Sequence, residues 1–336
     1  MRNCIFLFLA IFISCQEEIT LELPQSQEKV VVEGAIENGF PPYIILSKNQ
    51  GYFEPIDSNT YQNLFIKDAE VKVWTYNDDG SKDSIILEEY TIPAPPPLNQ
   101  FSVYTDLSGS GQFIGEEGKT YFLEVIYNDE IITSQTIIPF STPLDSLWVE
   151  KDTLAEEEYK YEIRGWFTDN GSIQNNILVR SKMIQHYEKE EDKCNIISKP
   201  DFSFKLLDAG SDILFNGTSF ETFFPKPPEN GGFPNGSYNI THTKECDDGT
   251  VLTLQNDIVL IKFCQIDEPS MKFWRGLSRA SASGGNPFSE PLNLVSNIDG
   301  GLGVWTGYGA IYYKVPVVQD TVIFEPFTPQ ITDIFK

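Results

Sequence analysis

The two histidines of this sequence and three of its five cysteines carry the side chains best suited to metal or disulfide chemistry. His186 lies eight residues before Cys194, and His242 lies four residues before Cys246. Two imidazoles and two thiolates would complete a closed tetrahedral zinc site. The alternative is a Cys194–Cys246 disulfide, which would close a loop of about 50 residues and stabilise the fold by about 4 kcal/mol on the chain-entropy estimate. The spacings match no recognised zinc finger, so the disulfide is the favoured interpretation, and Cys264, in an apolar run, is expected to be a buried free thiol.

The residue patterns give little support for catalysis. Both histidines lie in one polar region, and the sequence contains no Gly-x-Ser-x-Gly, no His-Glu-x-x-His and no phosphate-binding loop. With 49 acidic residues, carboxylate pairs arise by chance, so a carboxylate-dependent hydrolase is the weakest of the functional alternatives. We expect a protein that is not an enzyme and holds no cofactor.

The N-terminal segment has the features of an export signal. Arg2 precedes an apolar run over residues 5–13, which is too short for a membrane-spanning helix of about 20 residues. Phe12-Ile13-Ser14-Cys15 resembles the bacterial lipoprotein box, in which the cysteine becomes the lipidated N-terminus. The resemblance implies a signal peptide over residues 1–14, a lipid on Cys15 and a tether over residues 15–25, with a plainly secreted protein and an uncleaved anchor as the alternatives.

Charge restricts both the location and the partners of the protein. Residues 16–18 (Gln-Glu-Glu) resemble the acidic surface-export signal of Bacteroidetes lipoproteins, which implies outward display, whereas an ordinary solvated tether implies the periplasmic face. The formal net charge is −25, which disfavours nucleic acid and anionic lipid headgroups, because both require clustered Lys and Arg. The composition is rich in Tyr and Phe, which favours strands.

Residues 26–140 are predicted to form an N-terminal immunoglobulin-like or transthyretin-like β-sandwich. Residues 69–74 alternate apolar and polar side chains, as a half-buried strand does, and a turn signal follows at residues 77–80. The Pro-rich residues 93–97 are expected to form an extended loop. Residues 118–136 predict a hairpin that turns at Asn128-Asp129.

Residues 144–330 are predicted to form a second β-rich, sandwich-like domain, with an inserted loop region at about 186–250. A short helix is expected after Asp267, a suitable N-cap, with Pro269 in the first turn and an end near residues 283–285. The predicted fold class is therefore all-β, with two β-sandwich-like domains and one short helix in the second.

The passage after this helix is the most specific of the sequence. Residues 285–291 read Gly-Asn-Pro-Phe-Ser-Glu-Pro, and residues 296–308 read Ser-Asn-Ile-Asp-Gly-Gly-Leu-Gly-Val-Trp-Thr-Gly-Tyr. Together they resemble the C-terminal signature of the DUF4249 family, a set of Bacteroidetes lipoproteins of unknown function, although Trp305 stands where Phe is more usual. The resemblance implies an outer-membrane setting, often with genes for TonB-dependent transporters nearby, and no known catalytic residues.

The glycines of this passage permit a tight loop and a bulged strand, or the close approach of another chain. If the loop instead forms a ligand or partner surface, the expected contacts are Phe288, Asn297, Trp305 and Tyr308. The leading functional hypothesis is an outer-membrane lipoprotein, facing the cell exterior, that serves as a non-enzymatic binding or accessory protein of a TonB-dependent nutrient transporter. A structural or adhesive cell-surface protein is the alternative from another class.

Overall fold

The computed structural model describes residues 28–49, 63–96, 98–108, 113–189, 192–214, 216–227, 236–282 and 294–330, with the backbone alone at 185–189, 192–199, 214 and 281–282. Most of this chain forms β-strands, so the predicted all-β, sandwich-like fold class is confirmed. No helix of the described part is long and apolar enough to cross a membrane.

The largest sheet has nine strands and runs through the whole molecule. Its order is β12-β11-β18-β20-β1-β2-β6-β5. β13 pairs with residues 176–181 of β11, and β12 pairs with residues 184–189 of the same strand. The strands are β1 (Val30–Glu37), β2 (Tyr43–Lys48), β5 (Glu88–Pro93), β6 (Gln100–Thr105), β11 (Asn176–Lys189), β12 (Asp192–Pro200), β13 (Lys205–Ser211), β18 (Ile258–Gln265) and β20 (Leu302–Pro316).

Two five-stranded sheets pack against the large one. The first has the order β19-β8-β7-β3-β4, from Ile298–Asp299, Glu130–Ile137, Thr120–Tyr127, Glu70–Tyr76 and Lys82–Ile86. The second has the order β14-β10-β9-β21, from Ser219–Phe223, Lys160–Thr168, Ser146–Lys151 and Val322–Ile323, and β15 (Tyr238–Asn239) pairs with β10. A separate hairpin joins β16 (His242–Glu245) to β17 (Val251–Leu254), and a 3-10 turn spans Asp212–Leu214.

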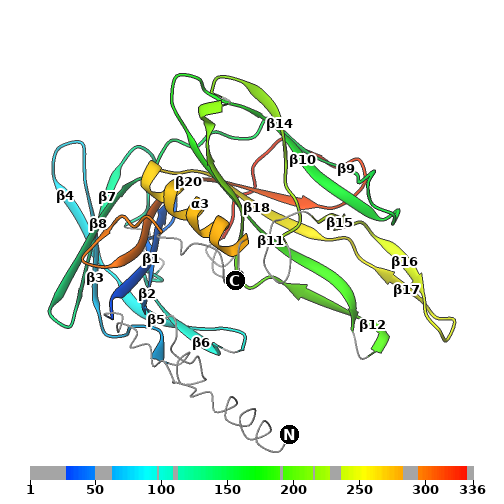
Figure 1. The fold of residues 1–336 in the computed structure, drawn as a ribbon, viewed down its shortest axis with the longest axis horizontal. Coiled ribbons are helices and arrows are strands. Elements are labelled where there is room, and N and C mark those ends of the chain that lie inside the picture. Colours follow the sequence, from blue (N-terminus) through cyan, green and yellow to red (C-terminus); the bar gives the residue numbers. More distant parts are fainter. Residues whose placement is uncertain are drawn as a thin grey trace, which may run out of the picture.

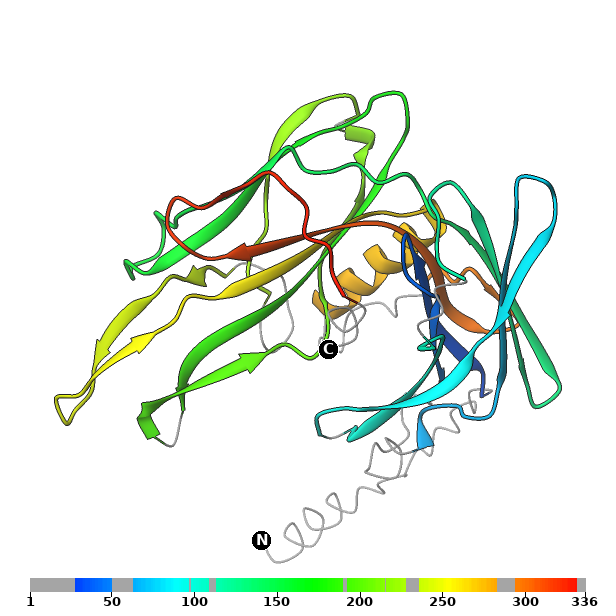
Figure 2. The same ribbon diagram turned by 180° about the vertical axis from the view of Figure 1, so that it is seen from behind.

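The large sheet is shared by two sandwich lobes, which lie on either side of β18 and β20 (Figures 1 and 2). One hydrophobic core fills the space between the β1 side of the large sheet and the β7–β8 sheet, and it includes Leu46, Leu123 and Trp305. A second core lies between β11, β18, β20 and the β9–β10 sheet, and it includes Ile163, Ile261 and Tyr313. A continuous sheet thus holds both lobes in one fixed arrangement.

β20 connects the two lobes because its two halves have different partners. Residues 302–308 pair in parallel with β1, and residues 309–316 pair antiparallel with β18. The glycines of β20 permit close approach of other backbone: a Cβ at Gly303 would lie 1.9 Å from the carbonyl oxygen of Val32, and one at Gly307 would lie 2.1 Å from that of Ile137. The segments that approach these glycines belong to the same chain, whereas the approach considered from the sequence was that of another chain.

Helix α3 (Glu268–Ala282) covers part of the other face of the large sheet (Figure 1). Asp267 caps it as predicted, because its Oδ1 accepts a hydrogen bond from the Ser270 N–H at 2.9 Å. Its Oδ2 accepts a second bond from the Thr136 hydroxyl at 2.8 Å, and that hydroxyl accepts the Gly307 N–H. The apolar side of the helix, including Met271 and Trp274, packs on β20 in a third core. The cap therefore ties the helix to β8 of the first lobe and to the shared strand β20.

The predicted hairpin forms as β7 and β8, with Tyr127 opposite Glu130 and positive φ angles at both turn residues, Asn128 and Asp129. The region of about 186–250, predicted as an inserted loop, contains strands β12 to β16. Four of these strands pair with the large sheet or with the β9–β10 sheet, so this region completes both sheets of the second lobe.

Candidate functional site

The face of the large sheet that carries α3 also carries a group of basic side chains. Side chains alternate between the two faces of a strand, and the face opposite the second core receives Arg180 and Lys182 from β11, Lys262 from β18 and Lys314 from β20. The register places Arg180 directly opposite Lys262, and Lys262 directly opposite Tyr312. Cations are therefore concentrated here although the whole chain has a net charge of −25.

Lys262 is buried in an ion pair with Glu37. Only 3% of Lys262 and 1% of Glu37 are exposed. The lysine ammonium donates to Glu37 Oε2, and the Tyr312 hydroxyl donates to Glu37 Oε1 at 2.8 Å. The ammonium also lies 4.2 Å from the centroid of the Tyr308 ring, a cation–π contact. Burial alone lowers the pKa of Lys262, but the charge of Glu37 raises it, and the net shift is upward.

Arg180 lies beside this pair without a carboxylate of its own. Its guanidinium carbon stands 4.1 Å from the centroid of the Trp274 ring, and Trp274 is fixed by a 3.3 Å hydrogen bond from its Nε1 to Thr306 Oγ1. Arg180 Nε is buried and has no hydrogen-bond partner. Among the described residues, no carboxylate forms an ion pair with Arg180. The site therefore holds one more positive charge than its buried carboxylate neutralises.

A cavity of about 170 Å³ opens at these two cations. Arg180 and Lys262 line it together with Glu33, Tyr43, Phe101 and Phe204. Burial raises the pKa of the Tyr43 phenol and of the Tyr308 phenol, so both are neutral at pH 7. Glu33 is exposed. The cavity combines a cationic end with aromatic walls, a combination that suits a small organic ligand.

Two larger hollows continue along the same face. One has a volume of about 540 Å³, shares Phe202 with the first cavity, and includes Lys182 and Lys314 in its lining. The other has a volume of about 630 Å³, lies around Phe40 and Tyr312, and shares Phe327 with its neighbour. The 540 Å³ hollow therefore borders both of the others.

The passage predicted to provide ligand contacts lies mostly in the core. The Asn297 side chain bonds the backbone of Trp305 twice, donating to its carbonyl at 2.7 Å and accepting its N–H at 2.9 Å. Trp305 is 0% exposed and its Nε1 donates to the Tyr121 carbonyl at 3.2 Å, so a ligand cannot touch it in this structure. Tyr308 is also buried and lies under Lys262. Phe288 lies outside the described residues.

The cysteines and histidines of the sequence analysis do not share one described site. Cys246 is disulfide-bonded, so its sulfur is not a thiolate that could bind zinc, and the His242 ring stacks on Tyr159 with centroids 3.8 Å apart. The structure describes only the backbone of His186 and Cys194, so the Cys194–Cys246 pairing stays a prediction. Cys15 lies outside the described residues. Cys194 lies in β12. This strand contacts β17, which is the strand of the β16–β17 hairpin that follows Cys246.

Cys264 is the buried free cysteine of the described chain, and burial raises the pKa of its thiol to about 12. A thiol in this state is inert rather than nucleophilic.

Sequence reasoning missed Arg180, Lys262 and Glu37. A signal was present, because Lys262 interrupts the apolar run of residues 258–264 and a charged residue inside a buried strand requires a partner. The alternating pattern alone does not identify that partner.

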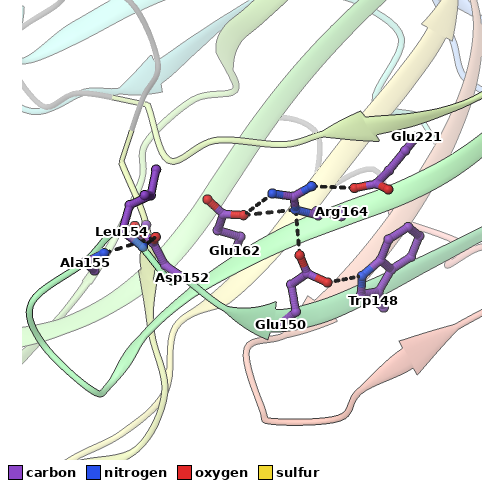
Figure 3. Close-up of polar contacts among 9 residues, drawn as sticks. Trp148, Glu150, Asp152, Leu154, Ala155, Glu162, Arg164 and Glu221 are labelled. Atoms are coloured by element: carbon purple, nitrogen blue, oxygen red, sulfur yellow. Dashed lines mark hydrogen bonds and ion pairs between the residues drawn. The ribbon is translucent and has the colours of Figure 1, made fainter.

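A second polar group lies on the outer face of the β9–β10 sheet, where three carboxylates surround Arg164 (Figure 3). The guanidinium contacts Glu150 and Glu162 at 2.8 Å each, and it also contacts Glu221. The hydrogen bonds that Arg164 donates to Glu221 and Glu162 raise the pKa of Arg164. All three carboxylates are engaged in ion pairs with this one arginine. This group is a surface ion-pair network.

The family model DUF4249, described as a domain of unknown function, matches residues 16–310. No curated protein matches the chain.

Proposed function

The chain belongs to the DUF4249 family, and we propose that it is a non-enzymatic ligand-binding protein, anchored to the outer membrane by a lipid on Cys15, that assists a TonB-dependent transporter. The observation that carries the binding role is the cavity at Arg180 and Lys262. A half-buried guanidinium whose Nε is shielded and has no hydrogen-bond partner is costly in a closed core, and the position of Arg180 on a cavity wall supports a site that a ligand completes.

The proposed location at the outer membrane is supported by the sequence alone. The short apolar run and the cysteine at its end support export and lipidation. A bacterial lipoprotein carries more than one acyl chain, and each buried methylene adds about 0.8 kcal/mol to membrane binding, so the attachment would be permanent. The acidic residues that follow Cys15 support display on the cell exterior.

The non-enzymatic role is supported by the way the reactive side chains are used. The Cys264 thiol is buried, the carboxylates around Arg164 are engaged in ion pairs, and Glu37 pairs with Lys262. These contacts stabilise the fold or the site and leave none of these groups as a free acid, base or nucleophile.

The test is isolation of the full-length tagged protein from its native outer membrane in mild detergent, with its partners identified by mass spectrometry. We expect a stoichiometric TonB-dependent transporter. The Cys15→Ser variant is the matched control, which should lose both the partition into detergent and the transporter. Recovery of the wild-type protein alone at every detergent strength would overturn the accessory role and favour an adhesive or structural one.

A further inference from the structure

Only one of the two cations at this point of the sheet has a carboxylate in direct contact. Arg180 and Lys262 are directly opposite each other on β11 and β18, and like charges in that relation destabilise a sheet. Glu37 compensates Lys262 through a direct contact. Arg180 has no carboxylate in contact among the described residues, and the exposed Glu33 acts on it electrostatically without an ion-pair contact, so its guanidinium can bind one further carboxylate directly.

The guanidinium of Arg180 is held in place for such a charge. The Trp274 ring lies against it at 4.1 Å, and Trp274 is itself buried and hydrogen-bonded to Thr306. Its Nε has no partner although it is shielded from solvent. Arg180 lines the cavity, and a planar guanidinium is suited to a bidentate contact with a carboxylate.

The cavity walls define the rest of the ligand. Phe101, Phe204 and Tyr43 line the cavity, and such aromatic surface favours an apolar or aromatic body over a bare inorganic ion. The two cations share the site with one buried carboxylate, Glu37, and one exposed carboxylate on the cavity wall, Glu33. A monoanion is therefore favoured over a dianion, which the two glutamates would repel.

We propose that the cavity between Arg180 and Lys262 binds the carboxylate of a small organic acid, with the carboxylate on Arg180 and the organic body between the aromatic side chains. This inference rests on the proposed ligand-binding function and specifies its chemical class. A longer acid would extend past Phe202, which borders both this cavity and the larger hollow that Lys182 and Lys314 flank.

The test uses benzoate as the probe, with benzamide as its neutral isostere and inorganic phosphate as the competing anion. Binding to the purified full-length protein is measured by isothermal titration calorimetry. We expect saturable binding of benzoate, at least tenfold weaker binding of benzamide and at least tenfold weaker binding of phosphate.

Two arginine variants locate the site. Arg180→Gln should weaken benzoate binding at least tenfold, and Arg180→Lys, which keeps the charge without the fork, should weaken it as well. Arg275→Gln is the matched control, because Arg275 is an exposed arginine next to Trp274 on α3, and it should bind benzoate like the wild type. Circular dichroism and thermal unfolding check that each variant is folded.

Equal binding of benzoate by the wild type and by a folded Arg180→Gln variant would overturn the proposal, and so would tighter binding of phosphate or the absence of saturable binding by benzoate. The failure of this proposal and the failure of the proposed function give different results. If the transporter co-purifies but benzoate does not bind, the accessory role stands and the carboxylate assignment is wrong. If benzoate binds through Arg180 but no transporter co-purifies, the site stands and the accessory role is wrong.

Discussion

Replacing Glu37 with Gln removes the buried carboxylate of the Lys262 pair while preserving the size of the side chain. Glu37 accepts from the Lys262 ammonium and from the Tyr312 hydroxyl, and both charged residues are almost fully buried. Breaking a buried ion pair by removing one partner costs about 3–5 kcal/mol, because the other charge remains buried and uncompensated. We expect Glu37→Gln to lower the free energy of unfolding at pH 7 by this amount.

The dependence on pH makes the prediction specific. In the wild type the pKa of Lys262 lies above its usual 10.5, so the pair stabilises fully at pH values below 10.5, and its contribution is lost as the pH rises through the folded-state value. In the variant the raising effect of Glu37 is gone and burial lowers the pKa of Lys262 instead. In the variant, Lys262 then binds its proton more tightly in the unfolded state than in the folded state. The free energy of unfolding of the variant therefore increases from pH 7 towards pH 10, and it approaches that of the wild type.

The assay is urea unfolding followed by tryptophan fluorescence, since Trp274 and Trp305 are buried, at pH 7, 8.5 and 10. Glu33→Gln is the matched control, because it makes the same change at an exposed position of the same strand, and it should alter stability by no more than about 0.5 kcal/mol. A Glu37→Gln variant within about 1 kcal/mol of the wild type at pH 7, or a difference that does not narrow at pH 10, would refute the reasoning.

Three further predictions concern the cap, the shared strand and the free thiol. Asp267→Ala removes the acceptor of the Ser270 N–H at the start of α3 and should cost about 1–2 kcal/mol in urea unfolding, whereas Asp267→Asn, which keeps a capping oxygen, should cost clearly less; equal losses would contradict the cap. Gly303→Ala should prevent folding to a soluble protein, because φ is +105° and the new Cβ would meet the backbone of Val32. The control is Gly210→Ala, which has open space around it and should express and melt like the wild type. A soluble Gly303→Ala variant with an unchanged melting temperature would disprove the close approach. Cys264 should resist iodoacetamide at pH 8 until urea unfolds the protein, because the thiol is buried and its pKa is raised to about 12; mass spectrometry showing labelling of the native protein would show that the site is open.

The sequence was sufficient for elements whose determinants are local. The β7–β8 hairpin follows from alternation and a two-residue turn, and α3 follows from Asp267, Pro269 and the apolar positions after them. In both cases the residues that decide the structure lie within one turn or one strand of each other, so no distant contact is required.

The arrangement of these elements depends on contacts that are distant in the sequence. β1 pairs in parallel with β20 near the other end of the chain, and Trp305 from β20 completes the core of the N-terminal lobe. Alternation identifies a strand and its buried face but carries no information on which strand lies beside it. The shared sheet was therefore outside what residue patterns alone predict.

The candidate site shows the same limit in its chemistry. Lys262 and Glu37 are 225 residues apart in the chain, and Arg180 reaches Lys262 only through the register of β11 on β18. Each of these charged residues, considered alone, would be interpreted as a solvent-exposed position of a strand. Their meaning depends on their combination: one buried and one half-buried cation, a single carboxylate in contact with them, and a cavity between aromatic side chains. Because a folded chain rarely leaves a buried donor unpaired, this combination indicates a ligand more directly than any single residue of the site.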